Sequence, residues 1–183
     1  MITNEINIVI GSWGSYNACN ERALGSGWLC LLDYTDWDEV ADELTKRGFD
    51  LEGIDEELFI QDIEGFDADV NWDYMNPEEL FNLLKESEVL EDSYKYDVMT
   101  AYLEVEGYES FKRLVDNYGH RWSDDINIYR GFDWEDYGRE VFDMMGYEIP
   151  ECILDYFNFK AYGESFQYDG IHEYSEGLIE ILR

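Results

Sequence analysis

Three short segments in the first third of the chain have the hydrophobic pattern of β-strands. Isoleucines alternate with other residues over 6–10, which is the period of a strand with one buried face. Apolar runs over 28–32 and 58–63 predict two further strands. Two or three strands are therefore expected in this part of the chain.

The segments between these strands predict a loop and a helix. The glycine-containing segment 11–17 is typical of a turn-rich loop. Apolar residues over 37–44 recur at helical spacing, with Thr35 as the predicted N-cap and Gly48 as the predicted stop. The pattern thus predicts a small α+β unit that ends near Gly65.

The middle of the chain has a helical pattern throughout. Asn76 followed by Pro77 is a typical helix start, because proline fits the first helical position. Apolar stripes follow over 80–84, 98–105 and 111–118. These stripes predict three helices whose apolar faces form a core, which leaves the acidic residues between them facing solvent.

The last third repeats the character of the first. Apolar residues alternate over 126–130, and 134–141 has the same helical spacing as the first unit's helix. An apolar stretch over 153–159 precedes a closing strand over 178–182. The chain is therefore predicted to have an α+β fold, with small α+β end domains flanking a helical middle. The predicted boundaries are 1–66, 67–122 and 123–183.

Charge is the strongest compositional signal. The sequence has 44 acidic and 12 basic residues, a formal net charge of -32. Duplex DNA carries one charge per ~1.7 Å of axis, so this charge equals that of roughly 54 Å, or ~16 base pairs. Such a chain is not a nucleic-acid binder of the usual kind, since phosphates are neutralised by Lys and Arg. Anionic membrane surfaces would also repel it.

Two interpretations of this charge remain: a solubilising or halophilic surface, or imitation of DNA. Aromatic residues make up 17% of the chain, which argues for a folded core rather than a disordered acidic segment. That aromatic content favours the DNA mimic.

The sequence lacks a signature of catalysis. No phosphate-loop, dinucleotide-binding or nucleophile-elbow motif occurs, and neither His120 nor His172 lies in a metal-binding pattern. We place His172 in a loop. Paired carboxylates are uninformative in so acidic a chain. We therefore expect no enzyme, no catalytic residue and no cofactor.

Cysteine usage and the N-terminal sequence indicate a cytoplasmic protein of the host cell. Cys19, Cys30 and Cys152 are widely spaced and odd in number, which predicts reduced thiols. The segment 1–14 has neither the basic nor the apolar region of a signal peptide, and no apolar run could span a bilayer.

One segment has the oxygen spacing of a calcium loop. Asp67, Asp69, Asn71 and Glu78 occupy positions one, three, five and twelve of an EF-hand. Trp72 stands at the sixth position, where the sharp turn requires glycine. We expect no dedicated metal site, and keep a divalent-cation-binding protein as an alternative hypothesis.

Several blocks of the sequence occur in the same order as in one known family. The N-terminal blocks are Ile8-Val9-Ile10-Gly11, Tyr16-Asn17, Gly27-Trp28-Leu29 and Glu57-Leu58-Phe59-Ile60-Gln61-Asp62. The C-terminal blocks are Ile149-Pro150-Glu151, Tyr156-Phe157-Asn158-Phe159 and Ala161-Tyr162-Gly163. Together they resemble the ArdA family of antirestriction proteins over nearly the whole chain. The sequence departs from that family by extra residues over 18–23, by Asn158 where Asp is usual, and by Glu164 near a common basic position.

The resemblance implies an elongated, curved, three-part molecule that pairs as a homodimer. It also implies the target, the methyltransferase core of type I restriction–modification enzymes, and protection of DNA that enters a new host on a mobile genetic element. A DNA mimic aimed at another DNA-binding protein is the remaining alternative.

Under this hypothesis, exposed carboxylates replace phosphates in the target's DNA-binding groove, without chemistry. The predicted mimic residues are Asp36, Asp38, Glu39, Asp42 and Glu43 on the first helix; Glu86, Glu88, Glu91, Asp92 and Glu104 in the middle; and Asp133, Glu135, Asp136 and Glu140 on the last helix.

The apolar residues Tyr156, Phe157 and Phe159 have two interpretations. They form a self-association surface, or they pack into the core of the last unit.

Overall fold

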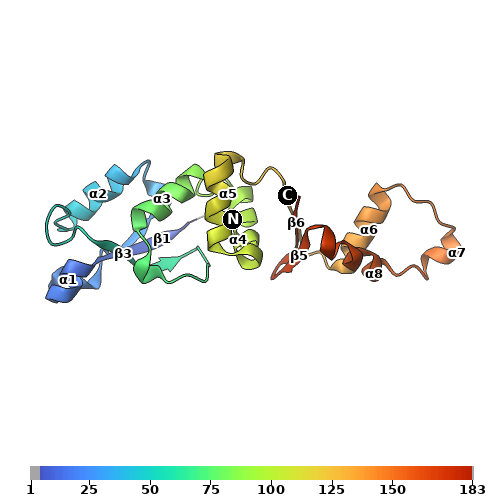
Figure 1. The fold of residues 1–183 in the computed structure, drawn as a ribbon, viewed down its shortest axis with the longest axis horizontal. Coiled ribbons are helices and arrows are strands. Elements are labelled where there is room, and N and C mark those ends of the chain that lie inside the picture. Colours follow the sequence, from blue (N-terminus) through green and yellow to red (C-terminus); the bar gives the residue numbers. More distant parts are fainter. Residues whose placement is uncertain (1–4, 183) are drawn as a thin grey trace.

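The structure, a computed structural model, describes residues 5–182 and has a mixed α+β fold (Figure 1). The parts follow one another along one long axis. The first sheet lies at one end, a pair of crossing helices lies in the middle, and a second sheet with its helices lies at the other end. The accessible surface is 10780 Å², against ~9,200 Å² expected for a compact protein of this mass. The excess agrees with the elongated shape.

The first sheet has three antiparallel strands in the order β2-β1-β3. They are β1 (Asn7–Ser12), β2 (Trp28–Cys30) and β3 (Leu58–Glu64). The register shifts between Val9 and Ile10, where β3 has an extra residue. The isoleucines of 6–10 are fully buried beside Val40 and Leu44 of α2 (Trp37–Lys46). The three predicted strands and the first predicted helix are thus confirmed.

Local signals in this unit were partly misleading. The loop predicted over 11–17 is wrong, because β1 continues to Ser12 and α1 (Trp13–Ala18) follows. Ser12 caps that helix by accepting from the Ser15 amide, 3.2 Å away. The predicted strand over 28–32 stops at Cys30 and continues as a 3-10 helix, η2 (Leu31–Asp33).

The predicted N-cap of α2 is also wrong by one residue. Asp36, not Thr35, accepts from the Glu39 amide, at 3.0 Å. The Glu39 carboxylate reaches back to the Thr35 amide at 2.7 Å. A carboxylate is favoured over a hydroxyl at this site by the helix dipole.

A buried carboxylate joins three segments of the first unit. Asp55 is fully buried; it accepts hydrogen bonds from the Ser15 hydroxyl and, at 2.9 Å, from the Asp50 amide. Arg22 forms an ion pair with it at 3.6 Å. Burial alone would raise the pKa of Asp55, but its hydrogen bonds and Arg22 together lower it below the ordinary value.

The helical middle is confirmed. It consists of α3 (Pro77–Glu86), α4 (Ser93–Glu106) and α5 (Tyr108–Tyr118). Asn76 caps α3 by accepting from the Glu78 amide at 2.8 Å, with Pro77 at the first helical position. Tyr118 is an exception to the predicted apolar stripe, because 53% of it is exposed.

One hydrophobic core runs through the first sheet and the middle helices. Ile8 and Phe66 belong to the same cluster of buried residues as Phe81 and Phe111. At its centre Trp122 is fully buried, packs edge-on against Phe111 and donates from its indole to the Ser87 carbonyl at 2.9 Å. The core therefore crosses the predicted boundary between residues 66 and 67. The division into three domains stays a prediction.

The second sheet is also antiparallel, in the order β4-β6-β5. Its strands are β4 (Ile126–Arg130), β5 (Ile171–Tyr174) and β6 (Gly177–Ile181). Its helices are α6 (Trp134–Met144), α7 (Glu151–Leu154) and α8 (Phe159–Glu164). Ile126 and Ile179 join the large core, whereas Ile171 and Leu178 join a second cluster around Tyr137. Because side chains alternate along a strand, this sheet contributes to two cores.

Besides the short helical segments Glu151–Leu154 and Ser165–Asp169, two elements of the last unit were missed. β5 contains His172, which was predicted to lie in a loop. The other is α8, which packs closely on α6 at two glycines: a Cβ on Gly138 would overlap the Phe159 carbonyl oxygen, and one on Gly163 would overlap that of Trp134.

Asp55 generates a pH-dependent prediction. Because its pKa is lowered in the folded state, it stabilises the protein above its unfolded pKa of about 3.9, and this stability is lost as the pH falls through the folded value. We expect Asp55→Asn to lower the free energy of unfolding by about 2 kcal/mol at pH 7. Urea denaturation at pH 7 and pH 3 should show the difference from wild type shrinking at the lower pH. Asp42→Asn, an exposed control, should not reproduce this, and a difference independent of pH would contradict the assignment.

Candidate interaction surface

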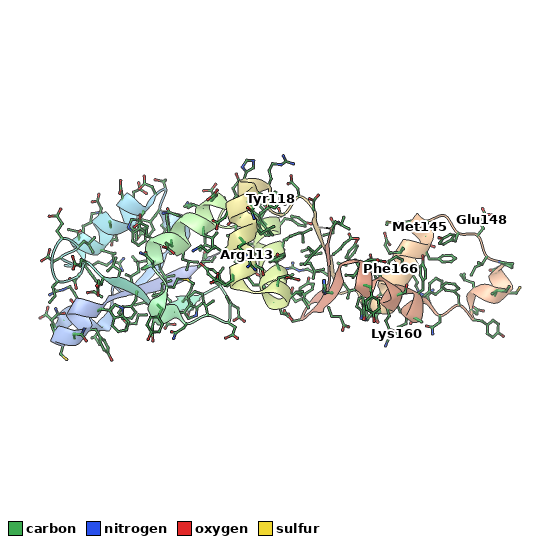
Figure 2. All side chains as sticks on the ribbon, in the orientation of Figure 1. Arg113, Tyr118, Met145, Glu148, Lys160 and Phe166 are labelled. Carbon is green, nitrogen blue, oxygen red and sulfur yellow. The ribbon has the colours of Figure 1, made fainter. Side chains whose placement is uncertain are left out.

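The predicted mimic residues all lie on the surface, spread over much of the long axis. Those of the first helix lie on α2 or cap it, the middle group lies on and between α3 and α4, and the last group lies on α6 or caps it. Each is exposed except Glu43, which is half-buried. Figure 2 shows side chains projecting all along the ribbon, with Tyr118 and Glu148 on the same side at distant points.

Basic residues on this surface are neutralised internally. Among residues 5–182, every lysine and arginine except Arg113 forms an ion pair with a carboxylate. The pairs are Arg22–Asp55, Lys46–Glu43, Arg47–Glu43, Lys85–Glu91, Lys95–Glu88, Lys112–Glu79, Arg121–Asp124, Arg130–Asp97, Arg130–Glu176, Arg139–Glu135 and Lys160–Glu164. The carboxylates outside these pairs carry the excess charge.

Ion pairing changes the chemistry of individual acids. The hydrogen bond from Arg47 lowers the pKa of Glu43. The hydrogen bond from Lys95, at 2.6 Å, lowers the pKa of Glu88. These carboxylates stay ionised, but each presents little net charge to a partner because a cation lies beside it.

Other predicted mimic residues serve the fold. Asp36, Asp92 and Asp133 are N-caps of α2, α4 and α6. Asp136 completes a capping box with Asp133. Glu104 accepts from the Ser175 amide at 2.7 Å and so links α4 to the turn between β5 and β6.

Four predicted mimic residues make no hydrogen bond or ion pair through their side chains with any described residue. We call them the unpaired set: Asp38, Asp42, Glu86 and Glu140. Sequence reasoning missed comparable exposed acids, including Glu109 and Asp116 on α5 and Glu148 beyond α6. Glu109 and Asp116 lie between the apolar residues of the α5 stripe, but their own side chains are exposed.

The segment 67–78 does not have the architecture of an EF-hand. It follows the strand β3 rather than a helix, and Asn71 caps a 3-10 helix, η3 (Trp72–Tyr74), by accepting from the Asp73 amide at 3.2 Å. Within residues 5–182, no group of three or more His, Cys, Asp or Glu side chains could hold a metal ion. Nor does any helix in this range have the length and apolarity to cross a membrane.

A comparison with protein families identifies the chain. The model of the family described as antirestriction protein (ArdA) matches residues 8–180. This chain belongs to the ArdA family. A comparison with curated proteins found no match. Membership supports an antirestriction function.

The predicted self-association residues of this ArdA chain lie in different environments. Tyr156 is 86% exposed. Phe157 is half-buried, its ring centroid 5.1 Å from that of Phe142, and Phe159 is buried beside the same ring at 5.4 Å. Further exposed apolar residues surround the segment that joins α6 to α7, at the end of the molecule in Figure 1. We call this group the apolar tip: Met144, Met145, Tyr147, Ile153, Leu154 and Tyr156.

Structural and electrostatic roles of a capping acid can be separated at Asp133. Its carboxylate accepts from the Glu135 and Asp136 amides at 2.8 and 2.9 Å. Asparagine caps as well as aspartate, whereas alanine leaves both amides without a side-chain partner. We therefore expect Asp133→Ala to cost about 1 kcal/mol in thermal denaturation and Asp133→Asn to cost much less. Equal losses in both variants would show that charge, not capping, is its structural contribution.

Proposed function

We propose that this protein is a DNA mimic that competitively occupies the DNA-binding groove of type I restriction–modification enzymes, in the cytoplasm of the host cell. The supporting observation is the segregation of charge. Lysine and arginine side chains are neutralised by ion pairs within the protein, while unpaired carboxylates face solvent on α2, α3 and α6 of an elongated molecule.

The separation of unpaired carboxylates from neutralised cations matters because a DNA-binding groove attracts an extended array of negative charges. Such a groove is lined by Lys and Arg, whose counterions are released when an anionic surface binds. A net charge of -32 supplies the charge of about 16 base pairs from one chain. Electrostatic steering would speed the encounter, and high salt would weaken it.

The mechanism requires no bond making or breaking. A carboxylate offers two acceptor oxygens to a guanidinium, as a phosphate does. Because the acids are distributed, no single carboxylate should be indispensable, and a single Asp→Asn substitution should be tolerated.

We further propose that the protein acts as a homodimer joined through the apolar tip. Exposed apolar residues that cluster at one place usually mark an interaction site. Pairing two chains end to end would double the anionic surface.

The competition prediction uses the methyltransferase core of a type I enzyme, labelled cognate DNA and this protein titrated at 50 and 200 mM salt. We expect displacement of DNA at low salt and a strong loss of direct binding at high salt. Neutralising the unpaired set by Asp38→Asn, Asp42→Asn, Glu86→Gln and Glu140→Gln should weaken binding about tenfold or more at low salt.

The matched control neutralises four ion-paired acids, Glu43→Gln, Glu88→Gln, Glu91→Gln and Glu135→Gln, with the same change in net charge. It should weaken binding less, since these charges are already compensated. Equal effects would show that total charge rather than the displayed carboxylates controls affinity. If the wild type does not displace DNA from the methyltransferase core at low salt, the proposed target is wrong. Another DNA-binding protein should then be tested as the target.

The dimer prediction exploits the different environments of neighbouring aromatics. Tyr156→Asp changes an exposed residue, so we expect a folded monomer in sedimentation velocity across a concentration series. Phe157→Asp introduces a charge among packed rings and should destabilise the last unit by about 3 kcal/mol. If Tyr156→Asp sediments like the wild type at every concentration, the apolar tip is not the interface.

A further inference from the structure

A hollow lies where the helical middle meets the last unit. Its volume is about 500 Å³. Glu104 and Val105 of α4 form one side, and Trp134, the 3-10 helix η5 (Ser165–Asp169) and β5 form the rest. Since four separate elements, α4, α6, η5 and β5, converge on it, the hollow is a property of the fold rather than of one loop.

Two carboxylates line this hollow, and one of them is fixed in place. Oε1 of Glu104 accepts from the Ser175 amide at 2.7 Å, which orients the carboxylate and leaves its second oxygen free of any hydrogen bond from the described residues. Glu173 on β5 is exposed and makes no ion pair within that part of the chain. The described residues that line the hollow include no lysine or arginine. Unlike the ion-paired acids elsewhere on the surface, these two carboxylates therefore have no lysine or arginine of the hollow's lining beside them.

Aromatic rings complete the lining. Tyr168 of η5 is 94% exposed and Trp134 is 6% exposed. An almost fully exposed tyrosine that lines the same hollow as two carboxylates offers a π-face to a cation. Stacking on a ring and pairing with a carboxylate together favour a planar guanidinium over an ammonium group.

The protein already holds one of its own guanidinium groups on a ring and a carboxylate, and another between two carboxylates. Arg139 lies over the ring of Phe159, 4.2 Å from its centroid, and pairs with Glu135 at 2.7 Å. Arg130 lies between Asp97 of α4 and Glu176, at 2.8 and 3.1 Å. The hollow offers the same combination of groups without an internal cation.

We propose that this hollow is a receptor for the guanidinium of one arginine side chain supplied by the protein's partner. It gives one discrete anchoring point within a surface whose other contacts are distributed. The identity of the donor, a basic DNA-binding groove, rests on the proposed function; the chemistry of the hollow does not.

The direct test uses N-acetyl-arginine methylamide as the probe and the full chain, followed by NMR. We expect saturable shifts of the Trp134 indole N–H and the His172 ring signals, with the lysine analogue binding several-fold more weakly. Tyr168→Ala and Glu173→Gln should each reduce probe affinity, while Glu148→Gln, an exposed acid elsewhere, should not. Shifts spread evenly over acidic residues would overturn the proposal.

The second test measures affinity for the methyltransferase core. Tyr168→Ala should lose about tenfold, whereas Tyr74→Ala, which removes a tyrosine that is 84% exposed and far from the lining residues in sequence, should match the wild type. Both tyrosines are exposed, so neither variant should unfold. Equal affinities would overturn the anchoring role. If the wild type fails to bind the enzyme but the probe still localises, the proposed function fails and the receptor stands.

Discussion

Mutual repulsion of carboxylates is the constraint that the rest of this structure accommodates. A net charge of -32 opposes any compact state, and the fold responds in three ways. It is elongated, which separates charges. It places Asp36, Asp92 and Asp133 at helix N-termini, where the helix dipole and unpaired amides favour an anion. It draws its cohesion from a core that runs unbroken from the first sheet to the second, with Trp122 fully buried inside.

The acidic residues fall into two kinds: those with a partner within the protein, and those that face solvent without one. Acids beside a cation stabilise the fold and lose much of their outward field, whereas capping acids that accept from neutral amides stabilise the fold and keep their charge. Acids such as Asp38 and Glu140, with neither, add to the field that a partner meets. This is a division of labour by local environment, because the two kinds alternate within single helices. On α2, Asp42 is unpaired while its neighbour Glu43 is held by Arg47.

The hydrophobic periodicity of the sequence predicted the architecture well because the core residues recur at the regular spacings of helices and strands. Both first-sheet strands flanking α2, the helical middle and the α6 stripe follow directly from it. Prediction failed where short-range signals compete. Gly14 suggested a loop, yet it lies in α1, and glycine is needed there because a side chain would overlap the Ile54 carbonyl oxygen. The strand around His172 was hidden by polar neighbours. For the surface, sequence identified exposed acids but not which of them are neutralised, since Lys95–Glu88 and Arg130–Asp97 each join residues that do not lie on one helix.

The position of β6 in its sheet has a consequence for how the molecule is made. The first sheet is complete once residue 64 has been synthesised, and its core can close on α3 to α5 soon afterwards. The second sheet is different, because its central strand is the latest in the chain order: β6 lies between β4 and β5 and pairs Ile126 with Ile181 across more than fifty intervening residues. Until β6 arrives, neither flanking strand has a partner, and the apolar faces of α6 and α8 have no finished sheet to cover. Between the synthesis of α5 and that of β6, the growing chain therefore carries a second sheet that cannot yet form, and its exposure to aggregation is concentrated in that interval.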